Sequence, residues 1–246
     1  MPLETSRLKE SLAGVKLRIS SAAARSGRDP DDIVLVAVTK TVGVETLKSL
    51  SELGWPDIGE NRVSVAVDKA RLFPGNKFLW HMIGHLQSNK AKRAAGLFDY
   101  VHSLDSISLA EELQSGALKL NKVIRVLIQV NVSSEATKSG IRPEELPDFY
   151  ASLKRVIKVT PDSGLLISGL MTMAPVTDNP ETVRPYFRKL RELRDKLKSD
   201  FIGNDNPEEL KYLSMGMSQD FEVAVEEGAN MLRIGSIIFA DTSAAG

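Results

Sequence analysis

The sequence of 246 residues lacks cysteine altogether. This absence excludes disulfides, thiolate metal sites and cysteine nucleophiles, and it is typical of a protein from a reducing compartment. We therefore expect a cytoplasmic protein. The sequence also has no excess charge of either sign, because 32 Lys and Arg residues balance 32 Asp and Glu residues. Since no net positive field would attract a polyanion, we expect no nucleic acid partner.

Long hydrophobic runs are absent as well. No apolar run approaches the roughly 20 residues that a membrane-spanning helix needs, and residues 1–7 lack the apolar core of a signal peptide. We expect a soluble, unprocessed chain without a membrane partner. Linker-like and low-complexity tracts are also missing, so residues 1–246 are expected to form a single domain.

Histidine is scarce, and two of the three histidines, His81 and His85, lie four positions apart. This spacing invites a metal-site interpretation. The two residues flank a predicted strand end instead of sharing a helical face, and no glutamate lies between them as in the zinc protease pattern. We therefore expect no metal site. His81 is predicted to be a packed strand residue, whereas His85 is a candidate for the lining of a pocket.

From Ile33 onward, short apolar runs alternate with longer amphipathic segments, which is typical of strand and helix units around a parallel sheet. Eight units within about 210 residues favour an α/β fold of one (β/α)8 TIM barrel. An open doubly wound sheet is less favoured, because no glycine-rich dinucleotide motif follows any strand. The predicted strands are 33–39, 57–59, 78–83, 99–103, 123–131, 165–172, 210–214 and 230–234.

An extra helix is predicted within residues 1–30, outside the barrel, because apolar residues recur there at helical spacing. These residues are Leu8, Leu12, Val15 and Ile19. The clearest later helix is 181–199, whose apolar stripe consists of Tyr186, Leu190, Leu193 and Leu197. Its basic residues are expected to form a solvated surface.

Lys40 closes the first strongly apolar run, 33–40, and such strand ends carry the reacting groups in a barrel. Burial disfavours an ammonium ion and lowers the pKa of a lysine from about 10.4 by as much as 3 to 5, which gives a free amine that condenses with an aldehyde. The alternative is a strand-terminal lysine that extends to solvent.

The seventh and eighth units contain candidate phosphate ligands, in 213–218 and 231–236. Loops at these two positions are the usual phosphate site of the fold. Gly235 and Ser236 would let backbone N–H groups approach an anion, and Ser218 either donates its hydroxyl to that anion or caps the helix that follows. Together with Lys40, these motifs predict a pocket for pyridoxal 5'-phosphate.

Two further residues have alternative roles. Arg233 in the last strand could face the pyridine nitrogen of the cofactor and keep it unprotonated, which predicts weak carbanion stabilisation. Otherwise it forms a salt bridge with a carboxylate such as Asp105. Asn61 either contacts the cofactor or caps the next helix.

The combination of motifs resembles the pyridoxal phosphate homeostasis proteins of the PROSC or YggS type, whose barrel is similar to the N-terminal domain of alanine racemase. The resemblance extends over 33–239, apart from a departure at 62–65, where relatives usually carry an aromatic residue followed by Gln and Glu. Its motifs are 35–40, 59–61, 80–90, 169–173, 213–222 and 233–235.

The resemblance implies a cofactor joined to Lys40 as an internal aldimine and a phosphate held by Ser218 and the backbone of Gly235 and Ser236. It also implies that Arg233 lies near the ring nitrogen. Further cofactor-binding residues implied by the same motifs are Asn61, His85 and Met215. The family is similar to a carrier or regulator of vitamin B6 supply, so PLP-dependent apoenzymes are the expected partners.

Racemase activity is not expected from the sequence. Racemisation needs a base on each face of the substrate, and in alanine racemase the second base is a tyrosine from a C-terminal domain of the partner subunit. This chain ends after the eighth unit, and none of its four tyrosines lies at a predicted strand mouth. We expect a monomeric carrier. The alternatives are a racemase or lyase of low efficiency and a barrel that binds another phosphorylated metabolite.

Overall fold

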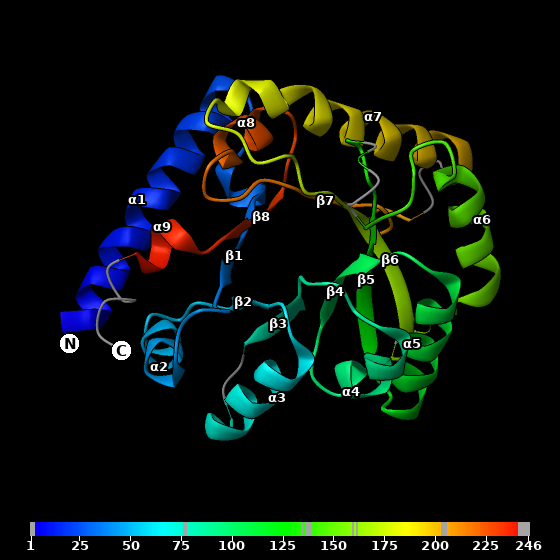
Figure 1. Cartoon of the computed structure of the whole chain (residues 1–246), viewed down its shortest axis with the longest axis horizontal. Helices are drawn as coiled ribbons and strands as arrows, with labels where there is room; N and C mark the ends of the chain where they lie inside the picture. Colours follow the sequence, from blue (N-terminus) through cyan, green and yellow to red (C-terminus); the bar gives the residue numbers. More distant parts are fainter. Residues whose placement is uncertain are drawn as a thin grey trace.

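The computed structural model of the protein describes residues 3–75, 78–133, 135, 139–158, 160, 162–202 and 206–240. Residues 1–2 and 241–246, which belong to the predicted domain 1–246, lie outside the described residues. Within the described part, eight strands pair in chain order to form a closed barrel, and every pairing is parallel. Figure 1 shows the helices arranged around the strands. The predicted (β/α)8 barrel is confirmed.

All eight predicted strands are present, and their ends agree with the predicted ends to within a few residues. They are β1 (Val34–Val38), β2 (Asp57–Glu60), β3 (Leu79–Met82), β4 (Tyr100–Leu104), β5 (Val123–Gln129), β6 (Gly164–Met171), β7 (Tyr212–Ser214) and β8 (Met231–Ile234).

Among the described helices, α1 precedes the first strand and the others follow strands. They are α1 (Leu3–Arg25), α2 (Val44–Glu52), α3 (Val63–Leu72), α4 (Ala91–Ala95), α5 (Ile107–Lys119), α6 (Leu146–Val156), α7 (Arg184–Phe201), α8 (Phe221–Glu226) and α9 (Ser236–Phe239), with 3-10 turns η1 (Pro30–Asp32), η2 (Ser88–Lys90) and η3 (Pro180–Val183). None of the helices in these described ranges is long and apolar enough to cross a membrane.

Helix α1 packs on the outside of the barrel, against α2, α8 and α9, as Figure 1 shows on the left. Its predicted apolar stripe is confirmed, because Leu8, Leu12, Val15 and Ile19 are all buried. Two ion pairs with α8 add to this contact, Arg18 with Glu222 and Arg25 with Glu226. The N-terminal helix is therefore an integral part of the domain surface.

Helix α7 differs from its prediction in two ways. Residues 181–183 form the 3-10 turn η3, and the α-helix begins at Arg184. Phe187, which the predicted stripe does not include, is fully buried. Tyr186 and Leu193, which the predicted stripe includes, are only partly buried. The basic face is also not simply solvated. Its arginines pair with Glu227 of the segment after α8, at 3.3 Å for Arg184, 3.0 Å for Arg188 and 3.1 Å for Arg191.

The interior of the barrel contains two kinds of side chain. One group is an apolar cluster, formed by Val36, Tyr100, Leu127, Met171 and Met231. The other group is polar and almost inaccessible to solvent, formed by His81, His102, Ser214 and Arg233. Successive strand residues point to opposite faces, so these alternate positions face inward while their neighbours pack against the helices.

Candidate functional site

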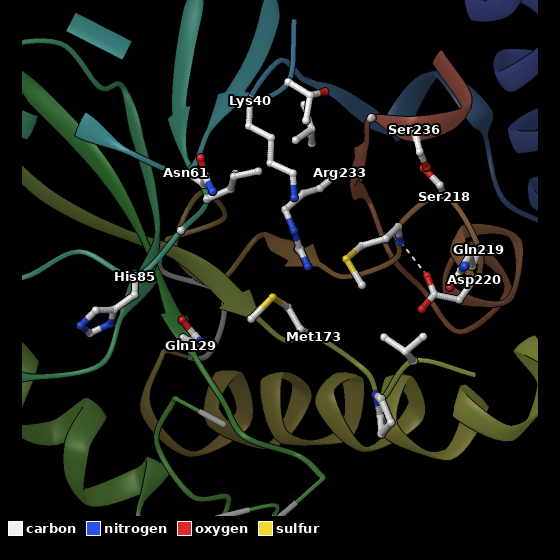
Figure 2. Close-up of a pocket in the computed structure, with 18 of the residues that line it drawn as sticks. Lys40, Asn61, His85, Gln129, Met173, Ser218, Gln219, Asp220, Arg233 and Ser236 are labelled. Atoms are coloured by element: carbon white, nitrogen blue, oxygen red, sulfur yellow. Dashed lines mark hydrogen bonds between the residues drawn. The ribbon is translucent and has the colours of Figure 1, made fainter. Parts of the chain in front are cut away.

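A pocket of about 500 Å³ lies at the carboxyl ends of the strands. Its lining comes from segments that follow every strand except β4, together with the last residues of β1 and β5, Val38 and Gln129, and with Arg233 inside β8. The volume is within the roughly 300–1,000 Å³ typical of small-molecule sites. Figure 2 shows Lys40 and Arg233 near the centre of this pocket, with Ser218 and Ser236 on one side. The site is thus at the end of the barrel where the sequence predicted it.

Lys40 lines the pocket, but it lies two residues beyond β1 and is exposed. This corrects the sequence argument, which assumed a buried amine: the sheet ends before Thr39, which is fully buried, and the next residue, Lys40, is exposed at the pocket. Two buried side chains, Lys69 and Glu60, hold Thr39 in place by hydrogen bonds. The Lys69 ammonium donates to the Thr39 carbonyl oxygen at 2.7 Å, and the Thr39 hydroxyl donates to Glu60 at 2.7 Å.

The loops after β7 and β8 bring the predicted phosphate ligands together, because Ser218, Gly235 and Ser236 all line the pocket. Neither serine hydroxyl has a hydrogen-bond partner among the described residues, and the same holds for their backbone N–H groups. A side chain at Gly235 would place its Cβ 3.1 Å from the Val38 carbonyl oxygen. The glycine therefore allows the last strand to approach β1 closely at the edge of the pocket.

Ser218 does not cap a helix, which corrects one of its two predicted roles. Helix α8 begins at Phe221, and the residue before it, Asp220, accepts a 2.6 Å hydrogen bond from the backbone N–H of Met217. This bond, drawn as a dashed line in Figure 2, closes a turn that contains Ser218. The hydroxyl of Ser218 is therefore left available to the pocket.

The predicted role of Met215 in binding the cofactor is also corrected. Its side chain is fully buried in the core between the strands and the helices, and it does not line the pocket. The strand alternation explains this position, since Ser214 faces the barrel interior and the next residue faces the opposite side. Met217 and Met173 are the methionines that line the pocket instead.

Arg233 is nearly inaccessible, with 5 % of its surface exposed, and it still reaches the pocket. It donates to the Ser214 hydroxyl at 2.5 Å and to the Thr172 carbonyl oxygen at 2.8 Å. Burial lowers the pKa of Arg233 to about 10, against the attraction of Asp220, so the guanidinium is charged at neutral pH. The predicted alternative, a salt bridge to Asp105, is wrong, because Asp105 lies beside His85.

Burial also acts on Asp220, a carboxylate whose charge interacts with that of Arg233. The pKa of Asp220 is raised, mainly by desolvation, while the Met217 N–H and the Arg233 guanidinium act in the opposite direction. Asp220 lines the pocket and was not singled out as a ligand from the sequence. Its place within the motif 213–222 was the signal that could have identified it.

Asn61 lines the pocket and does not cap the next helix. Arg62 occupies the N-cap position of α3, and no side-chain hydrogen bond caps that helix end. A Cβ at Gly84 would lie 2.4 Å from the Asn61 carbonyl oxygen. The loop after β3 therefore packs its backbone directly against the Asn61 backbone, and this contact fixes Asn61 at the pocket.

His85 lies at the edge of the pocket, and Figure 2 shows its ring away from Lys40. Its Nδ1 atom is 3.5 Å from a carboxylate oxygen of Asp105. His81 is fully buried inside the barrel, which confirms the prediction of a packed strand residue. Within the described ranges, no group of three or more His, Cys, Asp or Glu side chains is placed to hold a metal ion.

Comparison with known proteins gives consistent matches. The family model of the alanine racemase N-terminal domain matches residues 13–243. A pyridoxal phosphate homeostasis protein of Aquifex aeolicus is 43 % identical over 232 residues, which are 94 % of this chain and 97 % of that protein. The structure of PipY of Synechococcus elongatus with PLP bound is similar at a TM-score of 0.73 and 31 % identity, over 90 % of this chain and 99 % of PipY. A crystal structure of a protein of Bifidobacterium adolescentis reaches a TM-score of 0.82 at 29 % identity, over 97 % of both chains.

Proposed function

This chain belongs to the alanine racemase N-terminal domain family and, within it, to the pyridoxal phosphate homeostasis proteins, and on this basis we propose that it binds pyridoxal 5'-phosphate and serves in the homeostasis of that cofactor. The observation that carries the proposal is the convergence of an amine, Lys40, a pair of free hydroxyls and a buried guanidinium, Arg233, on one pocket. The structure of PipY with PLP bound supports the same conclusion.

The residues present fit the cofactor. The pocket is large enough for a molecule of this size, and it offers hydroxyl and N–H donors at Ser218 and Ser236 for a phosphate dianion. Gly235 provides the narrow approach between β8 and β1, which a Cβ would obstruct. Arg233 supplies a cation that is already desolvated, so its hydrogen bond to a pyridine nitrogen would not compete with bulk water.

Each residue has a defined role in this proposal. The Lys40 amine adds to the cofactor aldehyde and a Schiff base forms with loss of one water, a step that hydrolysis reverses. Ser218 and the backbone of Gly235 and Ser236 hold the phosphate, and Asn61 contacts the ring from the side of β2. Arg233 donates to the ring nitrogen and leaves it without a proton, which makes the bound cofactor a poor electron sink.

Two features favour carriage over catalysis. Lys40 is exposed, so the covalent bond is accessible to water and to competing amines. No tyrosine is among the described residues that line the pocket. Tyr100, for example, is buried inside the barrel, and burial followed by its neighbour Tyr212 raises its pKa well above the ordinary value. Among the described tyrosines, none is therefore placed to act as an opposing base.

Delivery of the cofactor to PLP-dependent apoenzymes, by a monomer in the cytoplasm, completes the proposal. The exposure of Lys40 supports such transfer, because a receiving enzyme's lysine can displace the Lys40 amine without prior opening of the barrel.

The proposal is tested by titrating the purified protein with pyridoxal phosphate and recording its visible absorption. We expect a yellow species that borohydride traps on the peptide containing Lys40. Lys40→Ala should abolish the band, whereas Lys48→Ala, which alters a lysine that is paired with Glu45 on the surface of α2, should not. A chromophore that survives in Lys40→Ala would contradict the covalent role.

Transfer is measured separately, by mixing the loaded protein with a PLP-dependent apoenzyme. Activation of the apoenzyme should be faster than spontaneous release of the cofactor, which dialysis of the loaded protein in an amine-free buffer measures. Equal rates would contradict delivery and leave cofactor binding intact.

A further inference from the structure

A continuous line of hydrogen bonds crosses the barrel interior from the pocket to the opposite end of β2. Arg233 bonds to the Ser214 hydroxyl at 2.5 Å, and that oxygen lies 2.9 Å from Nδ1 of His102. Nε2 of His102 lies 2.9 Å from Nδ1 of His81, and Nε2 of His81 lies 2.9 Å from Oδ1 of Asp57. Five side chains from five strands are thus linked without a gap.

The stagger of the barrel explains how residues so distant in sequence form this line. In the β3–β4 register His81 is level with Tyr100, so His102 lies two residues further toward the carboxyl ends, on the same inward face. Both histidines and Ser214 are fully buried, and Asp57 begins β2 with a side chain that is 15 % exposed. The line therefore rises toward the pocket through an interior that contains few other polar groups.

With both imidazoles neutral, the chemistry of the groups allows only one direction for every bond. A guanidinium only donates, so Ser214 Oγ is the acceptor in its bond with Arg233. The single hydroxyl proton of Ser214 goes to Nδ1 of His102, because the donors that lead to the Asp57 carboxylate, which only accepts, leave that nitrogen unprotonated. Burial, and then the neighbouring His81 and Arg233, lower the pKa of His102 well below its ordinary value, so this ring is neutral.

A neutral His102 that accepts at Nδ1 carries its proton at Nε2, and it donates this proton to Nδ1 of His81. His81 in turn carries a proton at Nε2 and donates it to the carboxylate of Asp57, which is an acceptor only. All donors thus point from Arg233 toward Asp57. No link is left with two donors or two acceptors facing each other.

We propose that His102, His81 and Asp57 are positioning residues for Arg233, and that this one-way line holds its guanidinium in the orientation that donates to the ring nitrogen of the cofactor. The inference rests on the proposed function, because it concerns the cofactor of that same pocket. A serine by itself can rotate its hydroxyl freely. A serine whose proton is committed to a fixed imidazole presents its lone pair to Arg233 in one direction.

The donor count of Arg233 agrees with this role. A guanidinium has five N–H groups, and the bonds to Ser214 and to the Thr172 carbonyl oxygen engage two of them. Donors remain for an acceptor in the pocket, which a pyridine nitrogen without a proton provides.

Asp57→Asn tests the inference at the residue farthest from the pocket. An amide N–H can donate to Nε2 of His81, which would reverse the tautomers of both histidines and make Ser214 Oγ accept from His102. The Ser214 hydroxyl proton would then have no imidazole acceptor to fix it, so Ser214 would no longer present its lone pair to Arg233 in one set direction. Asp57→Glu keeps an acceptor, and Asp68→Asn changes an exposed carboxylate on α3, so these two variants are the controls.

Two readouts are needed. Nitrogen-15 spectra of the histidines in the cofactor-free protein should show Nε2–H tautomers in the wild type and Nδ1–H tautomers in Asp57→Asn. Nitrogen-15 pyridoxal phosphate should report an unprotonated, hydrogen-bonded ring nitrogen in the wild type, and in Asp57→Asn a shifted resonance with roughly tenfold weaker binding, the effect of one misaligned charge-assisted hydrogen bond. Both controls should match the wild type in both readouts.

The outcomes separate the two proposals. An Nδ1–H tautomer of His102 in the wild type would overturn the direction of the line. Reversed tautomers in Asp57→Asn with an unchanged ring nitrogen and unchanged affinity would overturn the positioning role. Wild-type protein that binds no pyridoxal phosphate would refute the proposed function and the ring contact together, while the tautomers would still decide whether the line exists as described.

Discussion

The ammonium of Lys69 donates a 2.7 Å hydrogen bond to the carbonyl oxygen of Thr39, whose peptide bond leads directly into Lys40. Lys69 also forms a 2.6 Å ion pair with Glu60, and all three residues Thr39, Glu60 and Lys69 are buried. A buried lysine from α3 therefore fixes the backbone from which the exposed pocket lysine extends. Lys69 is buried and holds the backbone in place, whereas Lys40 is exposed and is proposed to bind the cofactor.

Breaking this buried pair should destabilise the protein strongly. Lys69→Met leaves Glu60 as a buried carboxylate without its partner, and one of its oxygens, Oε2, already has no hydrogen bond among the described residues. We expect a loss of about 3–5 kcal/mol in the free energy of unfolding, measured by urea denaturation. The double variant Glu60→Leu, Lys69→Met should recover most of it. Lys48→Met, at an exposed pair, should change stability by less than about 1 kcal/mol, and an equal loss there would contradict the argument.

The turn after β7 should require glycine at position 216. Gly216 has a φ of 95°, and a Cβ would lie 2.7 Å from the Cβ of Ala224. Gly216→Ala should therefore destabilise the protein by roughly 1–3 kcal/mol and weaken phosphate binding at the neighbouring Ser218. Gly14→Ala, in the exposed middle of α1 with no atom within 4 Å of the new Cβ, is the matched control. It should stabilise the protein by about 0.5–1 kcal/mol, and thermal unfolding of both variants distinguishes the two effects.

Acid should unfold the protein partly through His102. Because its pKa is held well below 6.5 in the folded state, the unfolded chain binds a proton that the folded chain does not. Stability is therefore full above about pH 6.5 and falls as the pH drops below it, by up to about 1.4 kcal/mol per pH unit. His102→Gln, which can still accept from Ser214, should show a smaller slope between pH 6.5 and 5.5 in urea unfolding. The same slope in both proteins would contradict this assignment.

The contribution of the phosphate site to affinity should be separable from that of the Lys40 amine. The double variant Ser218→Ala, Ser236→Ala should weaken binding of pyridoxal phosphate roughly a hundredfold, as expected for two charge-assisted hydrogen bonds of about 1.5 kcal/mol each. Binding of pyridoxal, which lacks the phosphate, should change little. Ser199→Ala, on the exposed face of α7, is the control. An equal loss of affinity for pyridoxal phosphate and for pyridoxal would show that the two serines do not contact the phosphate.

The strands and the position of the site could be predicted because they depend on local signals. Apolar runs such as 33–39 mark buried strands, and residues that follow them meet at one end of a parallel barrel. The errors come from orientation. The motif 213–218 does not show by itself whether Met215 or Met217 faces the pocket, and the apolar run before Lys40 does not show that the Lys40 side chain is exposed.

The interior line of hydrogen bonds could not be predicted from local signals. Its members lie on five strands, and which of them meet depends on the stagger of the closed barrel, as in the contact between His102 and Ser214, which are 112 residues apart. A histidine two residues after an aromatic strand residue looks like ordinary packing in the sequence. Its role depends on Ser214 and Arg233, which only the assembled barrel brings to it.

The register that places Arg233 beside Val36 joins the last strand to the first. Lys40 follows β1 and is made before the other strands, whereas the anion-binding loops follow β7 and β8 and leave the ribosome after the first six strands. A nascent chain that lacks β8 has an open sheet edge and half a pocket, so it would retain neither the aldehyde nor the phosphate. Uptake of the vitamin would then begin only after β8 has been made and has paired with β1, and a product that stops before β8 would not withdraw cofactor from the cell.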